Sequence, residues 1–280
     1  MNTLDLYQKV CLTSSRNTTR AYSTSFSLGI RSLHRSLHDP IYAIYGFVRF
    51  ADEIVDTFHD HDKAVLLKTF RQDTYRAIAD GISLNPILHS FQWVVNRYGI
   101  EEELYDTFLH SMEMDLEEVE HDQASYEKYI LGSAEVVGLM CLRVFCNGDK
   151  DLYTRLRPAA MRLGAAFQKV NFLRDLGDDH LSLGRTYFPG IDIANMTAAD
   201  KAAIEQDIEA DFAAALVGIR QLPRGARFGV YMAYVYYLTL FRKIKALSTD
   251  RILRERIRIR NRRKIALLTT SFLKHSFGLL

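Results

Sequence analysis

The chain has 280 residues, 48% hydrophobic and 25% charged, which is the composition of an ordinary soluble globular protein with one large core or two small ones. Its formal net charge of +2 hides an uneven distribution, discussed below. The three cysteines show neither CxxC nor zinc-site spacing, which argues against a cysteine-bound metal and favours reduced, buried thiols in a cytosolic protein.

Neither the N-terminal stretch nor the longest apolar run has the pattern of a targeting or membrane-spanning segment. The N-terminal stretch MNTLDLYQKV contains an acid and no apolar core, so we expect no secretory signal. The longest apolar run, GVYMAYVYYLTLF at residues 229–241, is too short to span a bilayer.

Helix signals recur along the whole chain, while strand signals are nearly absent. A polar capping residue before proline or an apolar run predicts a helix start, and glycine or proline after the run predicts its end. The predicted boundaries are Asp39 and Pro40 as a start, Asn85 and Pro86 as a start with Gly99 as the end, Ser125 as a start with Gly148 past the end, and Thr197 as a start with Pro223 as the stop. We expect about nine or ten helices in a single all-α domain covering residues 1–280.

One predicted apolar helix carries an unusual column of polar residues. In PIYAIYGFVRFADEIVDTF, residues three or four apart share a face, so Tyr45, Arg49, Asp52 and Asp56 stack with Glu53 beside them. Acids at this spacing repel each other, and in a low-dielectric cleft they need a neutralising positive charge. A bound divalent cation would supply it.

A second pair of acids shows how weak this spacing is on its own. Asp207 and Asp211 in EQDIEADFAAAL have the same separation, but their helix carries several other charges. We expect this pair to belong to a solvated helix face.

A second apolar helix, AAMRLGAAFQKVNFLRDLGDD, supports the metal hypothesis. Its oxygen-bearing side chains form a column at steps of three, four and four residues: Gln168, Asn171, Asp175 and Asp179. Carboxylates and an amide without histidine or cysteine favour Mg²⁺ or Mn²⁺ over zinc. The alternative is that both columns are exposed stripes in which Arg49 and Arg174 serve as ordinary ion-pair partners.

Such an arrangement suits a reaction on a diphosphate. Metal ions bound to diphosphate stabilise the negative charge that builds on a leaving group. If the carbon fragment leaves as an allylic cation, the cavity must exclude water, and aromatic faces can stabilise the cation without reacting. The many aromatic residues near the columns therefore indicate ionisation of a prenyl diphosphate.

These motifs resemble the head-to-head prenyl synthases, namely phytoene, squalene and dehydrosqualene synthases. Five segments carry the resemblance in order: YSTSFSLGIRSL, AIYGFVRFADEIVD, YILGSAEVVG, QKVNFLRDLGDD and GRTYFP. The match covers about residues 22–264. It implies the all-α isoprenoid synthase bundle around a central cavity.

The resemblance also implies roles for individual residues. The implied magnesium ligands are Asp52, Asp56, Asn171, Asp175 and Asp179. The implied diphosphate or substrate contacts are Tyr45, Arg49, Ser23, Ser25, Phe26, Gln168, Arg185, Tyr237 and Arg256. Tyr129 and Tyr187 would assist departure of diphosphate or steady the cationic intermediate. Two positions depart from the family: Glu53 stands where many relatives have Asp, and Glu135 stands where the family has a small residue, so that it either points outward or alters the cavity wall.

The basic C-terminal segment has several interpretations. Residues 242–264 hold eleven Lys or Arg against two acids. Part of the segment could bind phosphate, part could lie on an anionic membrane surface, and all of it could be a solvated helix face. Nucleic-acid binding is not expected, because no recognition motif accompanies the charge.

The resemblance favours phytoene synthase, which joins two geranylgeranyl diphosphates through a cyclopropyl intermediate with Mg²⁺ and without NADPH. The alternatives are a C30 synthase acting on farnesyl diphosphate and a catalytically silent helical assembly factor. A terpene cyclase is disfavoured because NFLRDLGDD does not fit its second metal motif. We expect a cytoplasmic protein, with peripheral contact with a membrane as one reading.

Overall fold

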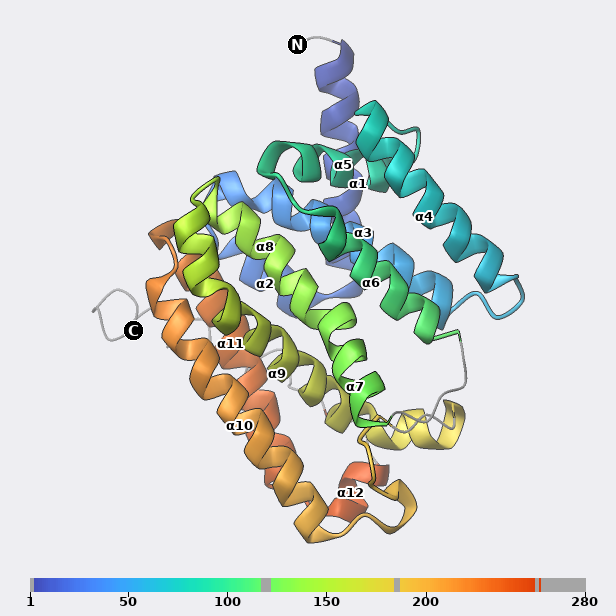
Figure 1. The fold of residues 1–280 in the computed structure, drawn as a ribbon, viewed down its shortest axis with the longest axis vertical. Helices are drawn as coiled ribbons and strands as arrows, with labels where there is room; N and C mark the ends of the chain where they lie inside the picture. The colour runs from blue at the N-terminus through green and yellow to red at the C-terminus, as the bar shows by residue number, and fades with distance from the viewer. Residues whose placement is uncertain (1–2, 117–121, 184–186, 255–256, 258–280) are drawn as a thin grey trace.

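The computed structural model describes residues 3–116, 122–183, 187–254 and 257, with side chains for all of these except 178–183, 194 and 254. Within this part of the chain every regular element is helical, so the predicted all-α class is confirmed (Figure 1). The α-helices are α1 (Thr3–Tyr22), α2 (Thr24–Arg31), α3 (His38–Asp56), α4 (Lys63–Asp80), α5 (Pro86–Tyr98), α6 (Glu102–Met114), α7 (Gln123–Ile130), α8 (Val136–Cys146), α9 (Lys150–Leu183), α10 (Ala198–Gln221), α11 (Arg224–Lys245) and α12 (Thr249–Arg254). The short turns are η1 (Arg35–Leu37), η2 (Leu131–Glu135) and η3 (Ile193–Asn195), of which η2 is π-helical.

Several predicted helix boundaries are confirmed. Asn85 caps α5 by accepting hydrogen bonds from the backbone N–H groups of Ile87 and Leu88, and Gly99 closes this helix with a left-handed φ of 61°. Thr197 caps α10 in a reciprocal capping box with Asp200. These positions follow local rules, since the capping partners lie within three residues.

Other predicted boundaries are wrong by a few residues. Asp39 is not the cap of α3, because the turn η1 brings the helix start to His38 and the Asp39 carboxylate instead accepts a hydrogen bond from Arg16 at 2.5 Å. Asp122, rather than Ser125, caps α7 by accepting from the Ser125 N–H at 2.7 Å. The predicted stop at Pro223 is confirmed, since α10 ends at Gln221, and Pro223 is also the capping residue of α11.

Buried apolar side chains form two clusters that share α9. The first lies mainly between α3, α5, α6 and α8, where the Phe47 and Phe91 rings stack at 3.8 Å between centroids. The second lies between α9, α10, α11 and α12 and includes Leu173, Phe212 and Phe241. The long helix α9 contributes its first turns to one cluster and its later turns to the other, so it connects the two.

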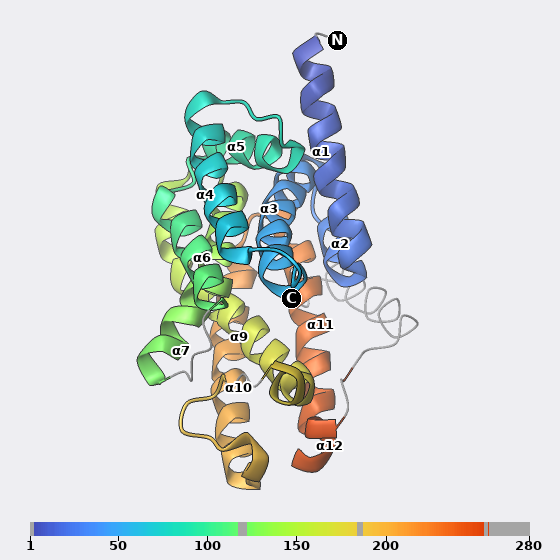
Figure 2. The same cartoon turned by 90° about the vertical axis from the view of Figure 1, so that its right-hand side faces the viewer.

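Helices α8, α9 and α10 run side by side across the molecule (Figure 1), while α1 extends beyond the other helices at its N-terminal end (Figure 2). Glycines allow the closest approaches. A Cβ on Gly164 of α9 would lie 2.6 Å from the carbonyl oxygen of Ala134, and one on Gly229 of α11 would lie 2.8 Å from that of Gly29. Any larger residue would push these helices apart.

One continuous helical stretch, Gln123–Cys146, is long and apolar enough by length and composition to cross a bilayer. It consists of α7, η2 and α8, and half of its most apolar window is buried inside the protein. The core helix of a folded domain meets the same criteria. The apolar run at 229–241 that stood out in the sequence lies within α11.

Candidate active site

A cavity of about 650 Å³ lies between the two apolar clusters and is lined by α2, α3, α6 to α9 and α11, with the end of α10. Both polar columns face it. The lining residues from the columns are Tyr45, Arg49, Asp52, Asp56, Gln168, Asn171 and Asp175. The lining residues nearer the N-terminal ends of α3 and α9 are apolar, so the cavity has a charged end and an apolar end.

Aromatic side chains connect the two columns at the charged end. The Phe26 ring lies 5.6 Å from Tyr45 of α3 and 6.1 Å from Tyr237 of α11, measured between centroids. The Tyr237 hydroxyl donates to Oδ1 of Asn171 at 3.4 Å, and its ring stacks on Phe167 at 4.0 Å. The two columns therefore meet around one space.

Arg49 is held on the α3 side of the cavity by two contacts. It donates a hydrogen bond to the Glu53 carboxylate, and its guanidinium lies 4.3 Å from the centre of the Tyr22 ring. Its buried Nε has no hydrogen-bond partner within the described part of the chain. Glu53 therefore pairs with Arg49 and does not line the cavity. The presence of Glu where many relatives have Asp leaves the set of lining acids unchanged.

Asp52 lies in a strongly negative environment. Burial, followed by the nearby carboxylate of Asp56, raises the pKa of Asp52 to about 7, and Asp115 acts in the same direction. The Arg49 guanidinium opposes this effect only in part. An additional positive charge in the cavity would therefore be bound favourably.

Asp115 is a lining residue that the sequence patterns did not reveal. It follows α6 as the C-cap residue and accepts a hydrogen bond from the Tyr129 hydroxyl at 3.0 Å. Its surroundings, EMDLEEVEHD, contain so many acids that no local signal distinguishes it. Only the packing of α6 against α7 brings it to the cavity.

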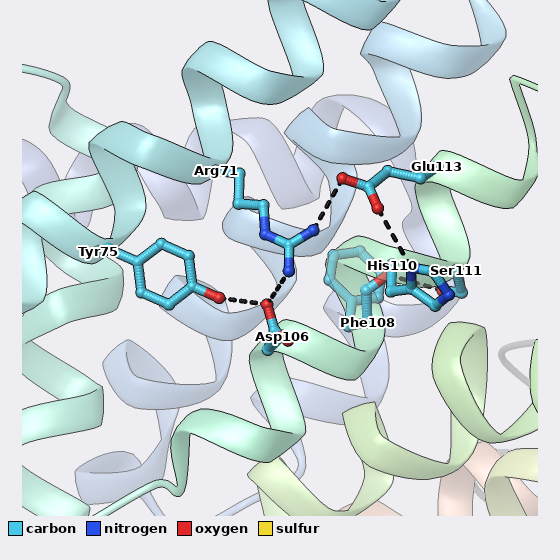
Figure 3. A network of polar contacts seen from close by, with 7 residues as sticks. All are labelled: Arg71, Tyr75, Asp106, Phe108, His110, Ser111 and Glu113. Carbon is cyan, nitrogen blue, oxygen red and sulfur yellow. Dashed lines mark hydrogen bonds and ion pairs between the residues drawn. The ribbon is translucent and has the colours of Figure 1, made fainter.

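A polar network on the outer side of α6 fixes the end of this helix (Figure 3). Arg71 of α4 donates to Asp106 and, at 2.8 Å, to Glu113, and Tyr75 also donates to Asp106. Because Glu113 lies two residues before Asp115, this network ties the segment that carries Asp115 to α4.

On α9, the acidic column is paired with arginine. Arg174 donates through both Nε and Nη2 to the adjacent Asp175, with the Nε to Oδ1 distance at 2.9 Å. Both residues nevertheless line the cavity, as does Gln168. The ion pairs expected in the alternative interpretation exist, but they lie at the cavity and not on an exposed stripe.

Tyr129 and Tyr187 lie together on one wall. The Tyr187 ring stacks on Phe172 at 4.1 Å, and the Tyr129 and Tyr187 centroids are 5.9 Å apart. Burial, and then the carboxylate of Asp115, raise the pKa of Tyr129 well above its usual value. Both tyrosines line the cavity, and Tyr129 is a neutral hydrogen-bond donor.

The other predicted site residues are placed differently. Ser23 caps α2 by accepting from the Phe26 N–H at 3.1 Å and also hydrogen bonds with Tyr45, without lining the cavity itself. Ser25 is not among the lining residues. Arg185, Arg256 and the side chain of Asp179 lie outside the described residues.

One surface interpretation is wrong, and one question that the sequence left open is answered. Asp207 and Asp211 do not form a solvated face together, because the Asp211 side chain is 1% exposed; the Asp207 side chain is 54% exposed, and both acids accept hydrogen bonds from buried Lys169. Glu135 does not line the cavity and instead faces Arg162, Lys169 and Asp211. These partners lie on other turns or helices, which spacing within one helix does not reveal.

The lining residues fit a hard cation. Four carboxylates line the cavity against two guanidiniums: Asp52, Asp56, Asp115 and Asp175, with Arg49 and Arg174. Among the described side chains, no group of three or more His, Cys, Asp or Glu forms a complete metal cage. Mg²⁺ needs no such cage, because it is commonly held by one or two carboxylates, waters and phosphate oxygens.

The chain is similar in sequence and in fold to known proteins. The family model for squalene/phytoene synthase matches residues 19–263. The presqualene diphosphate synthase of Rhodopseudomonas palustris is 27% identical over 191 residues, 67% of this chain and 66% of that protein, and the phytoene synthase of Thermus thermophilus is 27% identical over 277 residues, 92% and 91% of the two chains. A dehydrosqualene synthase solved with a ligand superposes with a TM-score of 0.81 at 20% identity, covering 98% of this chain and 100% of that one.

The chain spans slightly less than two thirds, 62 to 66%, of the length of the presqualene diphosphate synthases that it matches. The superposition confirms the predicted isoprenoid synthase fold, and the family model confirms the resemblance drawn from the motifs. This chain belongs to the squalene/phytoene synthase family.

Proposed function

We propose that this protein is a phytoene synthase that joins two geranylgeranyl diphosphates head to head and releases two diphosphates. The observation that carries the proposal is one cavity in which two columns of oxygen ligands, on α3 and α9, lie at one end and apolar side chains line the other. A substrate with a charged head and a long hydrocarbon tail matches this polarity.

The charged end supports binding of diphosphate together with Mg²⁺. Asp52, Asp56, Asn171 and Asp175 would hold the metal, with Asp179 as a further ligand implied by the family. When bound, Mg²⁺ supplies positive charge that stabilises the diphosphate as it leaves. Arg49 and Arg174, already fixed by Glu53 and Asp175, stand at the same end to contact the remaining phosphate oxygens.

The tyrosines and the apolar wall would protect the cationic carbon fragment. Stacked Phe172 and Tyr187, with Tyr129 beside them, offer aromatic faces close to the carboxylates. Toward the N-terminal end of α9 the cavity is lined by alanine, leucine and valine side chains, which offer no hydrogen-bonding groups to water that could quench the cation. The Tyr129 hydroxyl donates its hydrogen bond to Asp115. It would donate to a leaving phosphate oxygen only after this hydrogen bond is broken.

The length of the cavity along α9 supports the longer substrate. The lining of α9 continues to Asp175, and the part between Leu156 at the apolar end and Asn171 in the oxygen column is about 22 Å long at 1.5 Å per residue. An extended geranylgeranyl tail, advancing about 1.25 Å per bond, is about 20 Å long, and a farnesyl tail about 15 Å.

A C30 synthase acting on farnesyl diphosphate is the second candidate. It is favoured by the presqualene diphosphate synthase relatives and by the structural likeness to a dehydrosqualene synthase. NADPH is not part of either proposal. Cytoplasmic location and contact with an anionic membrane remain predictions, since six of the eleven Lys and Arg residues of the basic segment lie outside the described residues.

The test is to incubate purified protein and Mg²⁺ with each diphosphate separately and to identify the hydrocarbon by mass spectrometry. We expect phytoene from geranylgeranyl diphosphate, and no product from the Asp175→Asn variant. The control is Asp73→Asn, which changes an acid on α4 away from the cavity. Exclusive C30 product would replace the first candidate by the second, and a folded protein inactive on both substrates would favour an assembly factor.

A further inference from the structure

A cluster of charged side chains lies between α9 and α10, behind the wall of the cavity, with Lys169 and Asp211 buried at its centre and Asp207 and Arg162 half exposed at its edge. Lys169 donates through Nζ to Oδ2 of Asp211 at 2.7 Å and to Oδ2 of Asp207 at 2.5 Å, while Arg162 donates to Oδ1 of Asp211 at 3.0 Å. The Lys169 and Asp211 side chains are only 8% and 1% exposed. Neither residue lines the cavity, so the cluster is distinct from the site described above.

The cluster lies on the opposite face of α9 from the oxygen column. At 3.6 residues per turn, Lys169 is about 160° around the helix from Asn171, and Arg162 is two turns earlier on the same face as Lys169. Lys169 also directly follows Gln168. A fixed position for Lys169 therefore fixes the direction in which Gln168 and Asn171 point.

Directional bonds position a helix better than apolar packing does. Burial of hydrocarbon is non-directional and tolerates rotation or sliding of one helix on another. Hydrogen bonds between charged groups have strict geometry, and a buried pair that is broken leaves a costly unpaired charge. One cation shared by acids one turn apart on α10 thus sets both the rotation and the height of α9.

The π-helical turn η2 contacts the same cluster. Glu135 faces Lys169, Arg162 and Asp211, while Ser133 and Ala134 of this turn line the cavity. The carbonyl of Ala134 also contacts Gly164 of α9 closely. The positions of two cavity walls, η2 and α9, therefore depend on the same cluster of charged side chains.

We propose that Lys169, through Asp211 and Asp207, is a positioning residue that orients the Gln168 and Asn171 side chains for diphosphate and its metal ion. The inference rests on the proposed function for the identity of the ligand. It predicts that loss of the Lys169 cation weakens ligand binding although Lys169 never touches the ligand.

The test uses binding rather than turnover. Calorimetric titration of inorganic pyrophosphate in the presence and absence of Mg²⁺ is compared for wild type, Lys169→Met and Lys169→Arg. The matched control is Lys201→Met, which breaks another buried ion pair on α10, with Glu205, away from the cavity. Urea unfolding records how much stability each variant loses.

We expect Lys169→Met to weaken magnesium-dependent pyrophosphate binding by about tenfold, as for other groups that orient metal ligands. Lys169→Arg should restore most of the affinity, and Lys201→Met should keep the wild-type affinity at a similar loss of stability. If Lys169→Met does not fold, Lys169→Met/Asp211→Leu removes both charges and should show the same weakening.

Wild-type affinity in the folded Lys169→Met or double variant overturns the inference, as does equal weakening by Lys201→Met. A wild-type protein that shows no magnesium-dependent binding of pyrophosphate also overturns it. Failure of the proposed function is distinguishable: a protein that binds pyrophosphate with the expected pattern but forms no hydrocarbon refutes the synthase and leaves the positioning role intact.

Discussion

Replacing Asp52 by asparagine should stabilise the metal-free protein while abolishing its proposed activity. The carboxyl of Asp52 is half-buried in the cavity wall near Asp56 and Asp115, and its pKa is raised from 3.8 to about 7. The folded state therefore holds the Asp52 proton more tightly than the unfolded state does. Asparagine has nearly the same shape and no charge to bury.

The size and sign of this effect follow from proton linkage. Well below pH 3.8 Asp52 is protonated in both states, so its ionisation has no influence on stability. As the pH rises from 4 to 7 the wild type loses stability, up to about 4 kcal/mol at 1.36 kcal/mol per pKa unit. Water inside the cavity screens part of this cost, so we expect Asp52→Asn to be about 2 to 4 kcal/mol more stable than wild type above pH 7.

The assay is urea unfolding at pH 4.5 and pH 8 in EDTA, repeated at pH 8 with Mg²⁺. The difference between variant and wild type should be small at pH 4.5, large at pH 8, and reduced by Mg²⁺, which stabilises only the wild type. Asp73→Asn on α4 is the matched control and should show no such pH pattern. Equal free energies of unfolding for wild type and Asp52→Asn at pH 8 in EDTA would refute the reasoning.

Three further predictions concern the cavity and the scaffold. Ala160→Leu adds hydrocarbon at the apolar end of the cavity and should lower turnover of geranylgeranyl diphosphate by about tenfold more than that of farnesyl diphosphate, measured with each substrate alone; an equal loss would place the tails elsewhere. Arg71→Met removes two bonds between α4 and α6 and should cost about 1 to 2 kcal/mol in urea unfolding, whereas Arg76→Met, which breaks one exposed pair, should cost less than about 0.5 kcal/mol. Asn85→Ala should cost about 1 kcal/mol by removing the cap of α5, and an unchanged unfolding midpoint would contradict the capping role.

The helices and the two polar columns could be predicted because both follow from contacts within one helix. Asp52 and Asp56, or Asn171 and Asp175, share a face through the 3.6-residue period alone, and their apolar neighbours indicate which way that face points. The Asn85 and Thr197 caps depend on partners only two or three residues away. The orientation of both columns toward one cavity then required only that α3 and α9 lie on opposite sides of the same interior space.

The features that the sequence did not predict depend on contacts between helices. Asp211 has the same local pattern as a solvated acid, and only Lys169 of α9 shows that it is buried. Asp115 ends a helix amid many acids, and its importance comes from Tyr129 and Asp52 on two other helices. The direction of Glu135 was open because a π-helical turn shifts the face on which each residue lies.

The π-helical turn Leu131–Glu135 makes this stretch sensitive to insertion and deletion in a way that an ordinary loop is not. Each residue of a helix adds about 100° of rotation, so shortening the turn by one residue would swing Tyr129 roughly a quarter of a circle relative to α8. With α8 still packed against α9, the Tyr129 hydroxyl would no longer reach Asp115. A change of length in this turn would therefore change which side chain of this segment faces the cavity. Homologues that differ by a single residue at this point should present a different group to their substrates.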